Sequence, residues 1–229
     1  MKDTYILASE SSCDETASSI VKNAKEIVSN VVATQIDVHK DFGGVIPEVA
    51  SRIHVENISM VIEETLHKAN MKVEDVDAIA VTQGPGLVGS LHVGVQAAKT
   101  LAWAYNKPLV PVHHIAGHIY ANQLITELKF PLLALVVSGG HTELVYMKDE
   151  WSFEILGTTQ DDAIGEAGDK VGRVLGLPYP GGVYVDKIAK DGKPIYSLAK
   201  PKTENELDFS FSGLKSSVLQ FIDRCKRKN

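Results

Sequence analysis

Short stretches of alternating apolar and polar residues occur in two parts of the chain, and a small polar turn interrupts each. Residues 5–21 and residues 132–146 both read as an apolar strand, a turn rich in serine or glycine, and a second strand. Each stretch therefore predicts a β-hairpin. Because the pattern recurs near the start of each half, the sequence favours a duplicated architecture of two lobes with a cleft between them.

Between the hairpins the apolar period changes to that of an α-helix. Residues 55–69 and residues 91–105 have apolar side chains at helical spacing, and residues 76–82 between them read as a strand. The glycine-rich residues 83–90 precede the second helix, which is an arrangement suited to binding an anion. The motif Gly84-Pro-Gly-Leu-Val-Gly89 nevertheless lacks the Gly-Lys-Ser/Thr ending of a P-loop and does not match the dinucleotide-binding pattern. The alternation of strands and helices predicts an α/β fold.

Helical patterns also dominate the part of the chain after the second hairpin. Residues 161–176 predict a helix with an acidic first turn, and residues 178–186 predict a glycine turn leading into another helix. Asp169 and Asp186 lie on these helices, where acidic side chains are ordinarily solvated. Residues 207–215 lead into a last amphipathic helix. The second half lacks the βαβα portion of the first, so we expect a truncated chain with an incomplete second lobe.

Composition narrows the class of protein. The 229 residues, 44% hydrophobic and 23% charged, suit a globular protein of one large or two small domains. A net charge of −6 does not indicate nucleic-acid binding, although the basic residues of 214–229 form a local candidate patch or complement the dipole of a helix end. Without a signal peptide or a membrane-spanning run, and with Cys13 and Cys225 expected to be free thiols, the sequence predicts a cytoplasmic protein without membrane contact.

His114 and His118 are the strongest candidates for chemistry. They lie four residues apart, directly after the apolar residues 108–112, so a helix would place both imidazoles on one face. Such a pair can hold one metal ion, although a catalytic site also needs a further ligand and an open position. The alternative is a helix start whose histidines face solvent or the core. A zinc protease is not expected, because Ile115 stands where its general base would be Glu.

The turn of the second hairpin is the other candidate. Ser138-Gly-Gly140 leaves backbone N–H groups accessible, and such a concavity binds phosphate or carboxylate oxygens. The same residues also suit a tight turn with no ligand.

Eight ordered motifs together resemble the TsaD family of tRNA adenosine N6-threonylcarbamoyltransferases, formerly labelled O-sialoglycoprotein endopeptidases or glycoproteases, in their bacterial form. The resemblance extends over the whole chain. The motifs are Glu10-Ser-Ser-Cys-Asp-Glu-Thr16, Gly43-Gly-Val-Ile-Pro-Glu-Val-Ala-Ser-Arg52, Gly84-Pro-Gly-Leu-Val-Gly89, Val112-His-His-Ile-Ala-Gly-His118, Val137-Ser-Gly-Gly-His-Thr142, Gly165-Glu-Ala-Gly-Asp-Lys170, Tyr179-Pro-Gly-Gly182 and Asp208-Phe-Ser-Phe-Ser-Gly-Leu-Lys215.

This resemblance implies a two-lobed α/β fold of the actin, sugar kinase and Hsp70 (ASKHA) type. Residues 1–129 would form the first lobe with the metal motif, and residues 130–229 a partial second lobe with the nucleotide-binding hairpin. The family's enzymes transfer the threonylcarbamoyl group from threonylcarbamoyl-adenylate to N6 of the adenosine next to the anticodon. Their substrates are tRNAs that read codons beginning with A. The implied partners are the inactive paralogue TsaB and the small ATPase TsaE.

The resemblance also assigns roles to individual residues. It implies that His114 and His118 hold one divalent metal per subunit, for which we expect iron (Fe²⁺), with zinc as the alternative. It implies that the acyl-adenylate is bound by Val136, Val137, Ser138, Gly139, Gly140, Asp169, Gly182 and Asp186. The family's third metal ligand, an aspartate, and an adenylate-binding asparagine belong to a C-terminal region that these residues do not include. We therefore expect weak or no transferase activity from these residues alone.

Three other functions remain as alternatives. The chain could be the non-catalytic paralogue that dimerises with the transferase, but that protein is not expected to keep both the histidine pair and Ser-Gly-Gly-His. An ATP-dependent kinase of small molecules would use the same fold. A metalloendopeptidase, the historical label, lacks support from a glutamate beside His114.

Overall fold

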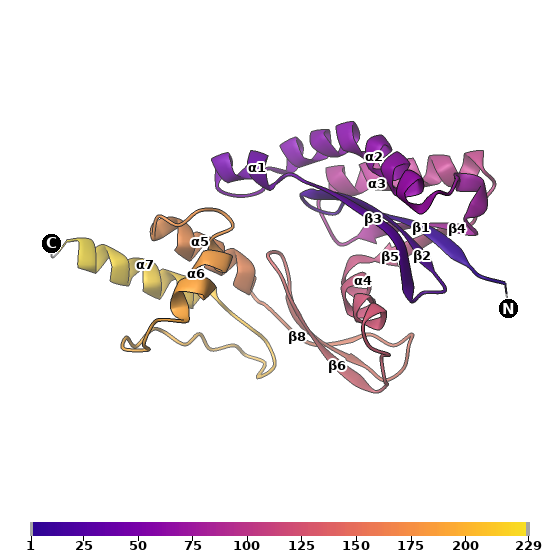
Figure 1. The fold of residues 1–229 in the computed structure, drawn as a ribbon. Coiled ribbons are helices and arrows are strands. Elements are labelled where there is room, and N and C mark those ends of the chain that lie inside the picture. Colours follow the sequence, from indigo (N-terminus) through magenta and orange to yellow (C-terminus); the bar gives the residue numbers. More distant parts are fainter. Residues whose placement is uncertain (1, 228–229) are drawn as a thin grey trace. The chain divides into compact units, whose positions relative to one another are not determined.

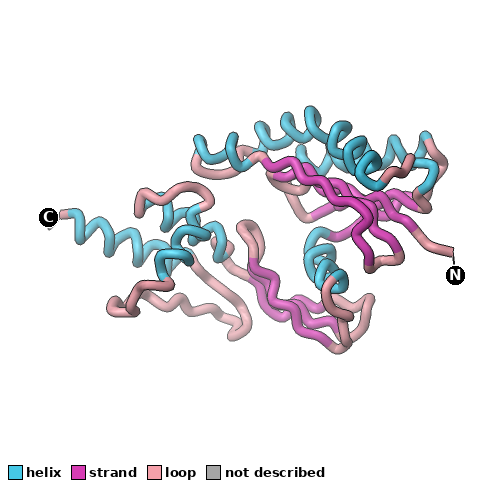
Figure 2. The backbone as a smooth tube through the Cα atoms, in the orientation of Figure 1, coloured by secondary structure: helices cyan, strands magenta, loops and turns pink. Residues whose placement is uncertain are grey.

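A computed structural model describes residues 2–227 of the chain. The chain divides into two compact units, Met1–Leu128 and Lys129–Asn229, and each is described by itself. Figure 1 labels the elements, and Figure 2 shows that both units combine strands and helices.

The first unit is built on a mixed five-stranded sheet in the order β3-β2-β1-β4-β5. The first three strands form an antiparallel meander, whereas β4 and β5 run parallel to β1. Because β1, β4 and β5 share a direction, their carboxyl ends lie at one edge of the sheet. The strands are β1 (Tyr5–Glu10), β2 (Glu15–Lys22), β3 (Glu26–Thr34), β4 (Ala78–Gly84) and β5 (Leu109–His113).

Two long helices, α2 (Pro47–Ala69) and α3 (Val88–Ala104), pack against each other and against this sheet. Helix α2 has a proline at its start and ends at Asn70 in the left-handed conformation, as helix boundaries commonly do. The core between helices and sheet includes Leu7, Ile20 and Ile79, each 2% exposed or less. The shorter elements are α1 (Ile36–His39), η1 (Lys40–Phe42), η2 (Val73–Asp75), α4 (His114–Tyr120) and η3 (Ala121–Leu124).

The second unit begins with an antiparallel meander of the same order as β1-β2-β3. Its strands are β6 (Leu132–Val137), β7 (Thr142–Met147) and β8 (Glu154–Thr158). Helices α5 (Ile164–Val174), α6 (Gly181–Ala189) and α7 (Ser212–Lys226) follow, and α5 packs against both α6 and α7. The repeated meander agrees with the internal duplication that the sequence suggested.

Both predicted hairpins are present, but each has a third strand that the sequence pattern did not reveal. The helix predicted from residue 55 already begins at Pro47. The helix predicted over 161–176 begins only at Ile164, so Asp161 and Asp162 lie before it, and the acidic residue of its first turn is Glu166. The carboxylates of these two residues instead bind groups near the start of α7.

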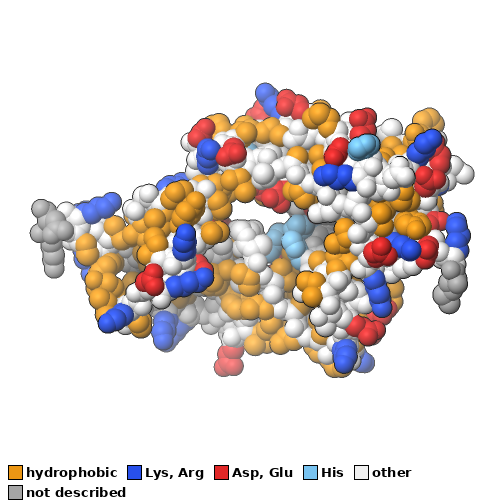
Figure 3. Space-filling view, viewed as in Figure 1, with side chains coloured by type: hydrophobic (Ala, Val, Ile, Leu, Met, Phe, Trp, Pro, Cys, Tyr) orange, Lys and Arg blue, Asp and Glu red, His pale blue; other side chains and the backbone are white. Residues whose placement is uncertain are grey.

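The predicted α/β class with a mixed sheet is confirmed, whereas the incomplete second lobe stays a prediction. None of the helices in residues 2–227 is long and apolar enough to span a membrane. Large apolar side chains nevertheless reach the surface, and Figure 3 shows hydrophobic side chains at many places on the face in view. Both cysteines are free thiols, as expected.

Candidate metal centre and nucleotide site

His114 and His118 lie side by side on the short helix α4, which starts where strand β5 ends. Their Nε2 atoms are 3.1 Å apart, and the two rings meet edge to face at 81°. The spacing of four residues therefore brings both imidazoles to one face of a helix, as the sequence predicted.

The separation of the two nitrogens matches a shared metal ion. Two Nε2 atoms 3.1 Å apart, each about 2.1 Å from one ion, would subtend an angle of about 95° at that ion. This value lies between the angles that neighbouring ligands make in octahedral and in tetrahedral sites. The same separation also suits an N–H···N hydrogen bond between neutral imidazoles. The separation of the two nitrogens is therefore compatible with joint ligation by this pair.

Glu10, at the carboxyl end of β1, orients the first of these histidines. Its Oε2 lies 3.1 Å from His114 Nδ1, and Ser12 Oγ lies 3.3 Å from the same nitrogen. Burial raises the pKa of Glu10, but hydrogen bonds with His114, Ser12 and Thr82 outweigh it and bring that pKa down to about 2. Because an ionised carboxylate can only accept a hydrogen bond, this contact favours the tautomer of His114 that has its proton on Nδ1 and its lone pair on Nε2, the nitrogen next to His118.

The sequence reasoning missed Glu10 as a site residue. The available signal was its place at the end of a strand parallel to β5, because the carboxyl ends of parallel strands meet at one sheet edge. The part of the chain that the structure describes contains no group of three or more His, Cys, Asp and Glu side chains placed to hold a metal. The histidine pair thus fits a metal ion but leaves further ligands to be supplied.

The second candidate site centres on the turn between β6 and β7. Ser138 Oγ accepts hydrogen bonds from the backbone N–H of Gly140 (3.3 Å) and of His141 (3.0 Å). The first N–H groups of α5 close on this turn, since Gly165 N donates to Ser138 O at 3.2 Å. A Cβ added to Gly165 would lie 2.7 Å from that oxygen, so only glycine permits the approach.

Helices α5 and α6 bring Asp169 and Gly182 together. Asp169 Oδ1 accepts the N–H of Gly182 at 2.9 Å, near the N-terminus of α6. The helix backbones nearly touch here, because a Cβ added to Gly172 would lie 2.7 Å from the Cα of Gly181. One carboxylate oxygen of Asp169 thus binds the start of α6, and the other can accept a hydrogen bond from a hydroxyl group.

The remaining predicted residues are placed less distinctively. Val136 is buried in the sheet and Val137 is 53% exposed, directly before the turn. Asp186 lies one turn further along α6, where its largely exposed carboxylate is 3.5 Å from Lys190 Nζ. The turn, the start of α5 and the Asp169–Gly182 contact therefore all belong to the second unit. That the histidine pair faces this turn across a cleft stays a prediction.

Comparison with known proteins decides the family. Residues 26–227 match the sequence family described as TsaD, tRNA N6-adenosine threonylcarbamoyltransferase. The chain belongs to the TsaD family. It is 62% identical over 228 residues to the tRNA N6-adenosine threonylcarbamoyltransferase of Anoxybacillus flavithermus, a match that covers 99% of this chain and 67% of that protein. The enzyme of the same name from Bacillus subtilis is also 62% identical, with 66% of its length covered.

These TsaD relatives are longer than the chain, which spans about two thirds of their length. Solved structures agree on the fold. Component A of (R)-2-hydroxyglutaryl-CoA dehydratase from Acidaminococcus fermentans is similar with a TM-score of 0.56 at 14% identity, over 98% of this chain and 70% of that one. The activator of 2-hydroxyisocaproyl-CoA dehydratase from Clostridium difficile gives 0.53 at 14% identity, over 98% and 67%. At this identity the likeness concerns the actin-like fold alone.

Proposed function

We propose that this TsaD-family chain takes part in transferring the threonylcarbamoyl group from threonylcarbamoyl-adenylate to N6 of the adenosine next to the anticodon in tRNA. Family membership supports the reaction class. The observation that supports the site most directly is the 3.1 Å separation of the two Nε2 atoms, with the first ring fixed by a carboxylate. Because the chain spans about two thirds of its relatives, the full reaction is proposed for the whole protein.

His114 and His118 would hold one divalent metal, with Fe²⁺ expected and Zn²⁺ as the alternative. When bound, such an ion supplies Lewis-acid stabilisation of negative charge on an acyl oxygen. The role of Glu10 is to hold the His114 ring in one tautomer and orientation, so that Nε2 stays available as a ligand.

The Ser138–Gly140 turn and the start of α5 would bind the anionic part of the acyl-adenylate. Backbone N–H groups in a turn and at a helix N-terminus favour phosphate and carboxylate oxygens. In the structure the N–H groups of Gly140, His141 and Gly165 donate to Ser138, so the anion would replace Ser138 as their acceptor. The second carboxylate oxygen of Asp169 is suited to a ribose hydroxyl. An acyl-adenylate is already activated, so these contacts have mainly to align its carbonyl with the attacking amine.

The proposed partners are a tRNA, an inactive paralogue of the TsaB type and a small ATPase of the TsaE type. We also propose a cytoplasmic location, where a tRNA substrate would be available. These partners rest on the family alone.

The test compares His114→Ala and His118→Ala with His67→Ala, whose ring is 85% exposed on α2. Elemental analysis of metal-loaded protein should find about one metal ion per chain in the unaltered protein and in His67→Ala, and none in the other two variants. Calorimetry with threonylcarbamoyl-adenylate should show binding that Gly165→Ala removes. Retention of metal by His114→Ala would overturn the metal centre, and absence of adenylate binding by the unaltered chain would overturn the nucleotide site.

A further inference from the structure

The segment between residues 208 and 212, which enters α7, is bound along the end of strand β8. Thr158 N donates to Asp208 Oδ1 at 3.0 Å, and Phe209 N donates to Thr158 O at 3.0 Å. Gln160 N then donates to Phe209 O at 2.9 Å. The motif at residues 208–215, to which the proposed function gives no role, is therefore attached to a part of the chain 50 residues earlier.

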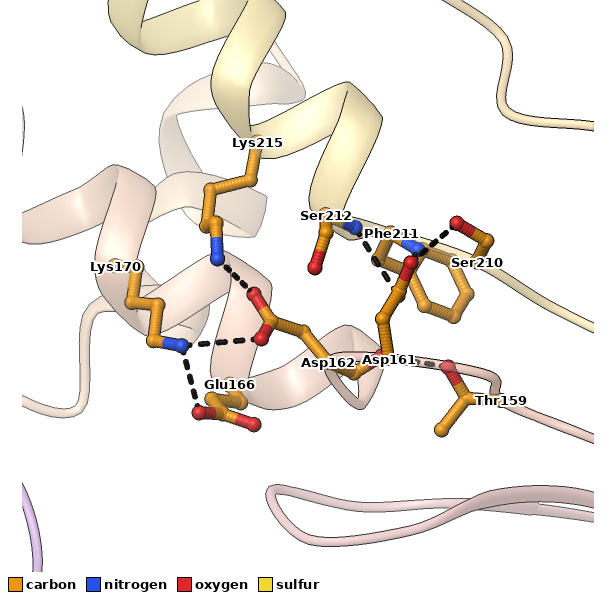
Figure 4. A network of polar contacts seen from close by, with 9 residues as sticks. All are labelled: Thr159, Asp161, Asp162, Glu166, Lys170, Ser210, Phe211, Ser212 and Lys215. Carbon is orange, nitrogen blue, oxygen red and sulfur yellow. Dashed lines mark hydrogen bonds and ion pairs between the residues drawn. The ribbon is translucent and has the colours of Figure 1, made fainter.

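Asp161 supplies the N-terminal cap of α7 from outside that helix. The residue before the helix, Phe211, provides no side-chain cap of its own. Instead Asp161 Oδ1 accepts the N–H groups of Phe211 (2.7 Å) and Ser212 (3.1 Å). Its other oxygen accepts the hydroxyl of Ser210, as Figure 4 shows. A carboxylate here satisfies N–H groups that a helix start leaves unpaired and complements the helix dipole.

Asp162, the next residue, joins α7 to α5 through two ion pairs. Its Oδ1 lies 3.1 Å from Lys170 Nζ on α5, and its Oδ2 binds Lys215 Nζ on α7 (Figure 4). The Asp162 and Lys215 side chains are only 14% and 18% exposed. Removing one partner of a largely buried ion pair is costly, because the other charge is left without compensation.

Asp161 and Asp162 are followed, after Ala163, by the start of α5, which contacts the Ser138–Gly140 turn. Thr159 Oγ1 donates to Asp162 O at 2.7 Å and thereby fixes the backbone before the helix. At the helix start, Ile164 N donates to Thr142 Oγ1 at 3.1 Å. The neighbouring Gly165 N donates to Ser138 O at 3.2 Å. A continuous series of contacts therefore runs from α7 through Asp162 to the turn.

We propose that Asp162, through its ion pairs with Lys170 and Lys215, is a positioning residue that couples the docking of α7 to the shape of the Ser138–Gly140 turn. Through this coupling, α7 influences the binding turn by way of Asp162 and the start of α5. The effect on the acyl-adenylate rests on the proposed function, whereas the coupling between helix and turn does not.

The experiment compares Asp162→Asn and Lys215→Met with Lys215→Arg, which keeps the charge. The matched control is Asp223→Asn, the same substitution on α7 in an exposed ion pair with Arg227, the residue that follows the helix. Amide hydrogen exchange of Ser138, His141 and Gly165 is measured in each variant, with amides of β1 in the first unit as an internal reference. Circular dichroism checks that each variant is folded.

We expect the three amides to exchange about tenfold or more faster in Asp162→Asn and Lys215→Met, with β1 unchanged. Lys215→Arg should largely restore protection, and Asp223→Asn should have no effect. Unchanged protection in the folded Asp162→Asn and Lys215→Met variants would overturn the coupling. A loss of protection that Lys215→Arg fails to restore would also count against it, because the charge would not be responsible.

Calorimetry with a stable analogue of threonylcarbamoyl-adenylate separates this inference from the proposed function. If the unaltered chain binds the analogue, Asp162→Asn should weaken binding about tenfold and Asp223→Asn should not. If the unaltered chain does not bind it, the proposed ligand is wrong while the exchange data still decide the coupling.

Discussion

The substitution Glu10→Gln tests whether the proposed metal centre depends on a residue that does not itself ligate. Glutamine keeps the size of the side chain but removes the negative charge that accepts the Nδ1 proton of His114 across 3.1 Å. A hydrogen bond to a charged group contributes about 1.5–3 kcal/mol. Because the Glu10 side chain is 33% exposed, we expect a value near the lower end, about 1.5 kcal/mol. That energy corresponds to about a tenfold loss of metal affinity, as is usual for residues that orient a ligand.

The affinity is measured by competition with a chromophoric chelator, using Zn²⁺ and, without oxygen, Fe²⁺. The matched control is Glu15→Gln, which removes an exposed carboxylate from the start of β2. We expect the control to bind as tightly as the unaltered chain. If Glu10→Gln also binds as tightly while His114→Ala loses the metal, the carboxylate does not orient the ligand and the reasoning is refuted.

Three further predictions concern the stability and shape of the two units. Gly165→Ala should displace the Ser138 turn and lower the melting temperature measured by circular dichroism, because its Cβ would lie 2.7 Å from Ser138 O; an unchanged transition would contradict the close approach. Burial raises the pKa of Asp162, but hydrogen bonds from Lys215 and Lys170 outweigh it and leave the pKa below 3.8. The stabilisation by this carboxylate should therefore be complete above about pH 4 and be lost as pH falls through the folded pKa. Denaturant titrations at several pH values should show that Asp162→Asn reduces this dependence of the free energy of unfolding on pH. Leu7→Ala, at a position 2% exposed, should lower the free energy of unfolding by about 2–5 kcal/mol in urea, and a loss under about 1 kcal/mol would show that the core relaxes there.

The sequence predicts well the features that arise from local periodicity. Both hairpins, the helices around residues 55–69 and 91–105, and the shared face of His114 and His118 follow from spacings of two or four residues. Features that depend on distant partners were missed. The start of α5 was misplaced because the acidic residues before it resemble a first helical turn, whereas their carboxylates bind groups about 50 residues away.

Glu10 was missed for a related reason. A carboxylate at a strand end has no local signature, and its role depends on a histidine more than 100 residues later, directly after a parallel strand. The turn at 138–140 was itself accessible to sequence reasoning, because serine and glycine between two apolar stretches are typical of a short turn. The approach of α5 to that turn still required the structure.

The near contact of the α5 and α6 backbones limits which residues can replace the glycines where the two helices cross. Where an added Cβ at Gly172 would reach the neighbouring helix at 2.7 Å, no side chain separates the two main chains. The position of the Asp169 carboxylate relative to the start of α6 is thus set by main-chain contact and not by side-chain size. Any side chain larger than that of glycine at this crossing would push the two helices apart and so displace the Asp169 carboxylate from the start of α6.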